Sequence, residues 1–180
     1  MAKSTSNTAM LEAATTQKIL LSKDYLDHLK KVNDVFYDQA KIADQKAAYI
    51  FTFMVAVLIT SAEGRNIFQM HRYMEVALPV VVFSAIMMAA SAVALVSSIL
   101  VVLPRRAKGS TSLFWGGWQK HRHEFTTAAE TDDSHYLFNE YLSNIDNLAV
   151  IATAKYRFVT LAFRALLVMA LAYLALLALT

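Results

Sequence analysis

Three histidines and two aspartates in one polar segment have the chemistry to bind a metal ion. His121, His123 and His135 lie near Asp132 and Asp133, and imidazole and carboxylate groups are common zinc ligands. Their spacing matches no zinc-binding signature, and the polar surroundings indicate an exposed segment. The chain also lacks Cys, the G-x-S-x-G and H-E-x-x-H motifs and a phosphate-binding glycine loop. The sequence therefore predicts neither a metal site nor an enzyme.

Arg164 is unusual because it interrupts an apolar run that extends over residues 158–180. An arginine at the centre of a membrane helix costs roughly 2.5–3.5 kcal/mol on insertion scales. If the bilayer begins near Phe158, Arg164 lies about 9 Å deep at 1.5 Å per residue, and its side chain can snorkel back to the cytoplasmic surface. The alternative is that Arg164 faces a partner helix or a polar pathway.

The elements that position these residues are membrane helices. Hydrophobic residues make up 57% of the 180 residues, a share too high for an ordinary soluble domain. About 20 apolar residues cross the roughly 30 Å hydrocarbon core. Because the first uncharged run begins only at Ala47, Lys46 must extend its amine towards the headgroups. The sequence predicts an all-α membrane protein with transmembrane helices over 44–62, 76–103 and 158–180. Within the second helix, Ala90, Ala94 and Ser98 form a small-residue ridge that suits close helix packing.

Basic residues predict the orientation of these helices. Lys and Arg are frequent before the first span and between the second and third spans, only Arg65 and Arg72 lie between the first two, and none follows the third. Positively charged loops stay in the cytoplasm, so the N-terminus is predicted inside and the C-terminus outside. The net charge of +3 is then a topology signal that requires no nucleic-acid partner.

The second span ends in a basic and aromatic segment. Pro104 stops the helix, and Arg105, Arg106 and Lys108 follow where anionic headgroups begin. Trp115 and Trp118 suit the same interface, because each indole is apolar but carries an N–H. The simplest interpretation is an anchored loop.

Two amphipathic helices are predicted outside the membrane. Apolar residues recur at steps of three and four from Leu21 to Ala43 and from Phe138 to Tyr156, so the two stripes are expected to pack as a cytosolic stalk. The domain organisation predicted is a flexible N-terminus over 1–9 and one domain over 10–180. That domain has cytosolic helices over 10–43 and 134–157 and a cytosolic loop over 104–133.

Four short motifs then carry a resemblance to a known family. They are A-D-Q-K-A at 43–47, L-P-R at 103–105, L-F-W-G at 113–116 and A-K-Y-R at 154–157. In this order, and at these places relative to the spans, they resemble the PycTM family over roughly residues 36–179. PycTM proteins are the transmembrane effectors of Pycsar antiphage defence, in which a pyrimidine cyclase makes cyclic UMP or cyclic CMP on infection.

The resemblance implies an effector in the bacterial inner membrane that impairs the membrane once the nucleotide appears, which arrests growth or kills the infected cell. It implies cyclic UMP or cyclic CMP as the activating ligand, no further cofactor, and a pyrimidine nucleotide cyclase as the functional partner. The family-motif positions in this chain are Asp44, Lys46, Pro104, Arg105, Phe114, Gly116, Lys155 and Tyr156.

Two interpretations of these positions remain open. Lys46, Arg105 and Lys155 are expected at the cytoplasmic membrane boundary, where together with Phe114 and Tyr156 they could bind an anionic nucleotide or hold a resting state closed. Alternatively, they only set topology and anchor the helices. Nothing resembles a separate cyclic-nucleotide-binding β-barrel, so either the stalk or another protein senses the ligand.

Three hypotheses for function follow. The leading one is a nucleotide-activated effector that acts as a homo-oligomer, because three helices enclose little aqueous space. The second is a passive membrane scaffold whose amphipathic helices recruit a partner. The third is a small channel that responds to another signal.

Overall fold

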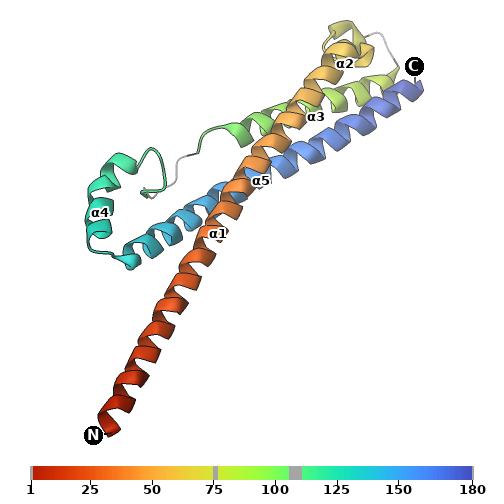
Figure 1. The fold of residues 1–180 in the computed structure, drawn as a ribbon. Helices are drawn as coiled ribbons and strands as arrows, with labels where there is room; N and C mark the ends of the chain where they lie inside the picture. Colours follow the sequence, from red (N-terminus) through yellow and green to blue (C-terminus); the bar gives the residue numbers. More distant parts are fainter. Residues whose placement is uncertain (1, 75–76, 106–110, 180) are drawn as a thin grey trace. The chain divides into compact units, whose positions relative to one another are not determined.

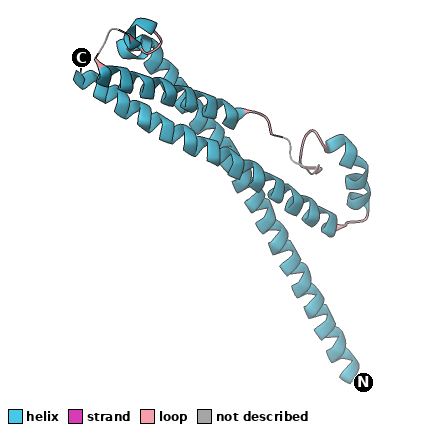
Figure 2. Ribbon diagram, turned by 180° about the vertical axis from the view of Figure 1, so that it is seen from behind, coloured by secondary structure: helices cyan, strands magenta, loops and turns pink. Residues whose placement is uncertain are grey.

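The computed structural model describes residues 2–74, 77–105 and 111–179, with side chains from Lys23 onward. All regular structure in these ranges is helical (Figures 1 and 2): α1 (Ala2–Thr60), α2 (Ala62–Asn66), the 3-10 helix η1 (Met70–Tyr73), α3 (Leu78–Val102), α4 (Trp118–Glu130) and α5 (Ser134–Leu179). The all-helical class is thus confirmed for these residues. Arg106 and Lys108, which were expected to meet headgroups, lie outside the described residues.

The chain forms two compact units. The membrane unit comprises Asp38–Arg106 and Val150–Thr180, and the α4 unit comprises Met1–Tyr37 and Ala107–Ala149. α1 and α5 each contribute to both units. Neither helix contains Pro or Gly, which would interrupt the backbone hydrogen bonds or weaken the helix, so each helix continues from one unit into the other.

Three helices are long and apolar enough to cross a membrane. The most apolar windows of α1, α3 and α5 have mean hydropathies of 1.5, 2.4 and 2.2. α3 begins at Leu78 and ends at Val102, within the predicted span 76–103. The three predicted spans are therefore present as helices of sufficient length and hydropathy.

The core of the membrane unit is an apolar seam between these three helices, which lie side by side in this unit (Figures 1 and 2). Met54 of α1, Met87 of α3 and Met169 of α5 are fully buried in it. A second apolar cluster joins Ala43 and Ala47 of α1 to Val101 of α3 and Val159 of α5. In this second cluster, the last turn of α3 meets residues of α1 and α5 that come before those of the first cluster in the sequence. α3 therefore runs antiparallel to α1 and α5.

The small-residue ridge on α3 faces this core, as predicted. Ala90, Ala94 and Ser98 are only 8%, 0% and 2% exposed. The Ser98 hydroxyl donates a hydrogen bond to the Ala94 carbonyl at 2.8 Å, so its polar group is satisfied within α3 and places no demand on a neighbouring helix. Small side chains allow the helix backbones to approach closely.

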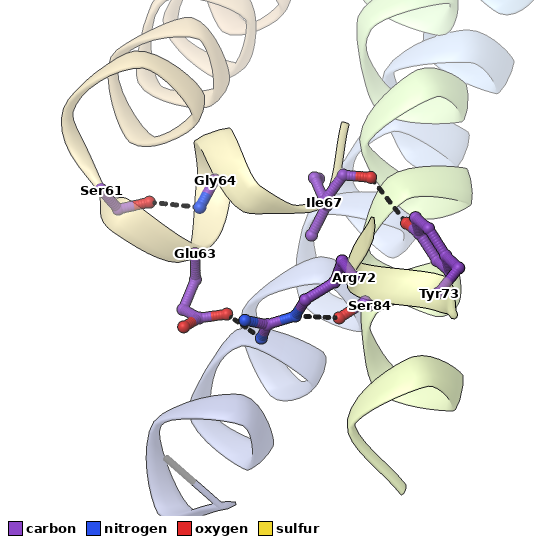
Figure 3. Close-up of polar contacts among 7 residues, drawn as sticks. All are labelled: Ser61, Glu63, Gly64, Ile67, Arg72, Tyr73 and Ser84. Carbon is purple, nitrogen blue, oxygen red and sulfur yellow. Dashed lines mark hydrogen bonds and ion pairs between the residues drawn. The ribbon is translucent and has the colours of Figure 1, made fainter. Parts of the chain in front are cut away.

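The connection between α1 and α3 closes one end of the membrane unit (Figure 3). Ser61 caps α2, because its hydroxyl accepts a hydrogen bond from the Gly64 N–H at 2.9 Å. The Tyr73 hydroxyl donates to the Ile67 carbonyl at 2.6 Å. Partial burial raises the pKa of Tyr73 above its usual value, so this hydroxyl stays a donor to a higher pH than an exposed tyrosine would.

A buried ion pair lies in the same connection, and we call it the Glu63–Arg72 lock. The Arg72 guanidinium donates to the Glu63 carboxylate and, through Nε, to the Ser84 hydroxyl of α3 at 3.2 Å (Figure 3). The Arg72 and Glu63 side chains are only 9% and 10% exposed. From the sequence, Arg72 is only a topology signal, because nothing in the local sequence pairs it with a carboxylate nine residues earlier.

α4 is a correction to the sequence analysis, which predicts a loop over 104–133. Residues 118–130 contain neither Gly nor Pro, and an aromatic chain supports the helix. Trp118 packs on Phe125 with ring centroids 5.5 Å apart, and Phe125 packs on Tyr136 of α5 at 6.4 Å. α4 gives way to a turn at Asp132, which has a positive φ of 52°, a conformation that Asp tolerates better than most residues.

The predicted cytosolic stalk is not confirmed. Within the α4 unit, α1 and α5 are joined by a polar contact, because the Asn144 side chain donates to the Asn33 side chain at 2.7 Å. Ile145 is buried, but Tyr25 and Leu142 of the two predicted stripes are 62% and 43% exposed. A continuous apolar seam between the amphipathic helices remains a prediction.

Candidate functional site

The candidate site is a group of polar and aromatic side chains in the membrane unit, which we call the boundary cluster. Gln39, Asp44 and Lys46 come from α1, Arg105 follows the end of α3, and Lys155, Tyr156 and Phe158 come from α5. The second apolar cluster of the membrane unit includes Tyr156 and Phe158 at its edge. The boundary cluster thus lies where the apolar seam gives way to charged residues, as expected at a membrane boundary.

An ion pair joins α5 to α1 in this cluster. The Lys155 ammonium donates to the Asp44 carboxylate. The Lys155 side chain is 10% exposed and that of Asp44 is 38% exposed. Among the residues that the structure describes, Asp44 supplies the one carboxylate that compensates the charge of Lys155, whereas the Asp44 carboxylate itself is partly exposed.

Tyr156 makes two contacts with α1. Its hydroxyl donates to the Gln39 side-chain oxygen at 2.7 Å. The Lys46 ammonium lies 5.4 Å from the centroid of the Tyr156 ring, within the range of a cation–π contact. Together with the ion pair, these contacts join three side chains of α1 to two adjacent residues of α5.

Arg105 contacts an aromatic ring of α5. Its guanidinium lies 5.1 Å from the centroid of the Phe158 ring, and one terminal N–H donates to the Leu100 carbonyl at 3.2 Å. The Nε atom is buried and has no hydrogen-bond acceptor among the described residues. Because a guanidinium has five N–H donors, Arg105 has unused capacity to bind an oxygen-rich anion.

The charge balance of the cluster is positive. The cluster contains three cations, Lys46, Arg105 and Lys155, and one carboxylate, that of Asp44, which pairs with Lys155. In the described part of the chain, Lys46 and Arg105 contact aromatic rings and form no ion pair. A cation–π contact contributes roughly 0.5–2 kcal/mol, so an anion that enters the cluster can replace it at modest cost.

Pro104 contributes to a different feature from the boundary cluster. It lines a groove of about 430 Å³ between α1 and α3 together with Ala47, Ala48, Phe51, Thr52, Ser98, Ile99, Val102 and Leu103. Apolar side chains dominate this lining. The groove therefore suits hydrocarbon better than a nucleotide phosphate.

Phe114 and Gly116 belong to the α4 unit. The Phe114 ring lies 5.6 Å from that of Trp115, and a Cβ atom on Gly116 would come within 2.7 Å of the Phe114 ring. Gly116 thus allows the Phe114 side chain to fold over the turn. The expectation that Phe114 faces the cations of the boundary cluster remains a prediction.

Arg164 lies on the outer side of α5. Its side chain is exposed, whereas Ala162 and Ala165 on either side of it are buried in the core. Among the described residues, no hydrogen bond or ion pair of Arg164 is found. This position suits snorkelling or a contact with another chain, and it does not suit a role in the packed core of this unit.

Gln39 and Phe158 belong to the cluster but are not among the site residues predicted from the sequence. Gln39 lies two helical turns before Lys46, and Phe158 lies three residues after Lys155, so helical periodicity could have suggested both. For the histidines, the search of the described residues finds no group of three potential metal ligands. His121 instead lies 3.1 Å from Glu124 on the same helix.

A family model described as the Pycsar effector protein domain, PycTM, matches residues 28–180. This range contains every residue of the boundary cluster and the three predicted membrane spans, 44–62, 76–103 and 158–180. No curated protein and no solved structure matches the chain.

Proposed function

The chain belongs to the PycTM family of Pycsar effector domains, and from this premise we propose that it impairs the bacterial inner membrane when cyclic UMP or cyclic CMP is made on infection. As a family member it is an antiphage defence effector. The proposal adds the activating ligand, the membrane lesion and the growth arrest or cell death that follows. A pyrimidine nucleotide cyclase would supply the ligand.

The observation that carries the proposal is the state of the cations in the boundary cluster. A cyclic pyrimidine nucleotide has one phosphodiester charge and an aromatic base. Arg105 offers a buried N–H without an acceptor among the described residues, and Lys46 lies over an aromatic ring. A phosphodiester can accept from both cations, and a base can stack on a ring from which a cation has been displaced.

The same cluster holds α5 against α1, which links binding to a structural change. The Lys155–Asp44 ion pair and the Tyr156–Gln39 hydrogen bond join these helices. A nucleotide that draws Lys155 or Tyr156 away from its partner favours a state in which α5 has shifted. It shifts the equilibrium only by the difference in its affinity for the two states.

The lesion itself requires more than one chain or a direct disturbance of lipid. Apolar side chains fill the seam between α1, α3 and α5, and Met54, Met87 and Met169 are 0%, 0% and 1% exposed. One resting chain therefore offers no aqueous path through this seam. We propose a homo-oligomer, in which the outer side of α5 with Arg164 contacts a neighbouring chain or a polar pathway.

Leakage from inverted membrane vesicles tests the proposal. Vesicles that contain the chain receive cyclic UMP or cyclic CMP, and dye release is compared with that from protein-free vesicles. One nucleotide should cause release, and Arg105→Gln should abolish it. Arg157→Gln is the matched control, because Arg157 is an exposed cation on the same helix turn as Tyr156. It should leave release intact.

Two other outcomes would contradict parts of the proposal. If neither nucleotide causes release, this chain alone does not sense the messenger. Cells that express the chain together with the cyclase then distinguish the remaining possibilities. Arrested growth would indicate a separate sensor or another messenger, whereas normal growth would favour the passive scaffold.

A further inference from the structure

The turn before α4 presents apolar side chains to the surroundings. Trp115 is 87% exposed and Trp118 is 40% exposed, and Leu113 and Phe114 beside them are also exposed. We call these four residues the aromatic tip. Large apolar groups gathered on a surface mark a place where a partner or a membrane binds.

The aromatic tip is held in a fixed conformation within the α4 unit. The Phe114 N–H donates to the Thr111 carbonyl at 3.2 Å, and the Gly117 N–H donates to the Phe114 carbonyl at 2.8 Å. Thr111 in turn donates from its hydroxyl to Asn144 of α5 at 3.2 Å. A tip that is already ordered loses little conformational entropy when it binds.

The charges around the tip identify the partner. Residues 105–124 contain five Lys or Arg and one carboxylate, that of Glu124. A second carboxylate, that of Glu140 on α5, accepts from the Ser112 N–H beside the tip, so cations outnumber carboxylates by five to two. Among the cations, Arg122 lies one helical turn after Trp118 and is exposed. Tryptophan is the side chain most typical of the bilayer interface, and basic residues favour anionic lipid by roughly 1 kcal/mol each.

The covalent connection keeps the tip near the bilayer. Leu113 lies eight positions after Arg105, which follows the end of α3. A fully extended chain of this length reaches about 28 Å. The lipid surface at that end of α3 is therefore present at a high effective concentration.

We propose that the aromatic tip is a docking site for anionic phospholipid, which inserts into the leaflet at the Arg105 end of α3 with the help of Lys120 and Arg122. This binding anchors the α4 unit to the membrane surface. The proposal is independent of any nucleotide. It therefore stands or falls separately from the effector mechanism proposed above.

Tryptophan fluorescence of the full-length chain in proteoliposomes tests this proposal. The chain has only two Trp, so its emission reports on the tip alone. Trp118→Phe isolates Trp115, and Trp115→Phe isolates Trp118. Vesicles of phosphatidylcholine, with or without phosphatidylglycerol, are measured with a lipid quencher near the headgroups and with aqueous iodide.

With phosphatidylglycerol, we expect emission from Trp115 to move to shorter wavelength, to be quenched by the lipid quencher and to be protected from iodide. The paired substitution K120Q/R122Q should weaken insertion by about fivefold for each charge removed. High salt should act in the same direction. The control K23Q/K31Q removes two exposed charges from α1 in the same unit and should have no effect.

Two outcomes would overturn the proposal. Full access of iodide to Trp115, without lipid quenching, would show that the tip stays in water. Protection from both quenchers, increasing with the ratio of protein to lipid, would show that a second copy of the chain covers the tip instead.

Discussion

Removing the carboxylate of the Glu63–Arg72 lock should destabilise the membrane unit strongly. Glu63→Gln keeps the size and a hydrogen-bond acceptor but leaves the Arg72 charge with no opposite charge in the lock. The two side chains are only 10% and 9% exposed, so solvent compensates little. Loss of one partner from a buried ion pair costs roughly 3–5 kcal/mol, and we expect a loss of about 3 kcal/mol because Ser84 still accepts from Arg72.

Reversible unfolding in mixed micelles, followed by helical circular dichroism, measures this change. The control is the double variant E63L/R72L, which removes both charges and should lose less stability than Glu63→Gln alone. A loss below about 0.5 kcal/mol for Glu63→Gln, the size of an ordinary surface substitution, would refute the argument that this pair is buried and structural.

Three further substitutions probe other parts of the membrane unit. Asp44→Asn should leave the nearly buried Lys155 without its carboxylate and cost about 1–3 kcal/mol, less than a fully buried pair because Asp44 is 38% exposed; unfolding in the same micelles measures it. Ala94→Leu should overpack the ridge, where Ala94 is 0% exposed, and cost about 1–3 kcal/mol; a stability equal to wild type would show that the helices are not in close contact. Arg164→Ala should leave insertion intact and reduce nucleotide-dependent leakage, and unchanged leakage would assign Arg164 to snorkelling.

The membrane helices could be predicted from the sequence because each is specified by its own composition. An uncharged run of sufficient length has few alternatives to a spanning helix, and the Ala90, Ala94 and Ser98 ridge is visible as a spacing of four. α4 was missed because its support is not local. The packing of Phe125 on Tyr136 joins two helices, and the local pattern within residues 118–130 is limited to two large apolar residues, Trp118 and Phe125, spaced by seven.

The site was predictable only in part, for a related reason. The cations Lys46, Arg105 and Lys155 could be expected near the boundary, since charge marks where apolar runs end. Their partners could not be assigned, because Asp44 and Lys155 are 111 residues apart in the chain. The Glu63–Arg72 lock shows the same limit at shorter range, because a turn of unknown geometry separates the two residues.

The two ends of the membrane unit differ in what is needed to open them, which bears on where activation begins. At the α2 end, both partners of an ion pair are nearly buried, and separating them costs several kcal/mol. In the boundary cluster, the contacts that hold two of the three cations within the described ranges are aromatic rings and a carbonyl. An anion can take over these contacts as it displaces them. A ligand whose affinities for two states differ moderately can therefore rearrange the boundary cluster, but it cannot open the Glu63–Arg72 lock. If a nucleotide opens this protein, the helices should therefore separate first at Asp44 and Lys155, while the Glu63–Arg72 lock stays closed as the pivot. Spin labels at Lys41 and Arg157 should then report a larger distance change on activation than labels at Arg65 and Leu177. An equal change at both ends would contradict a pivot at the lock.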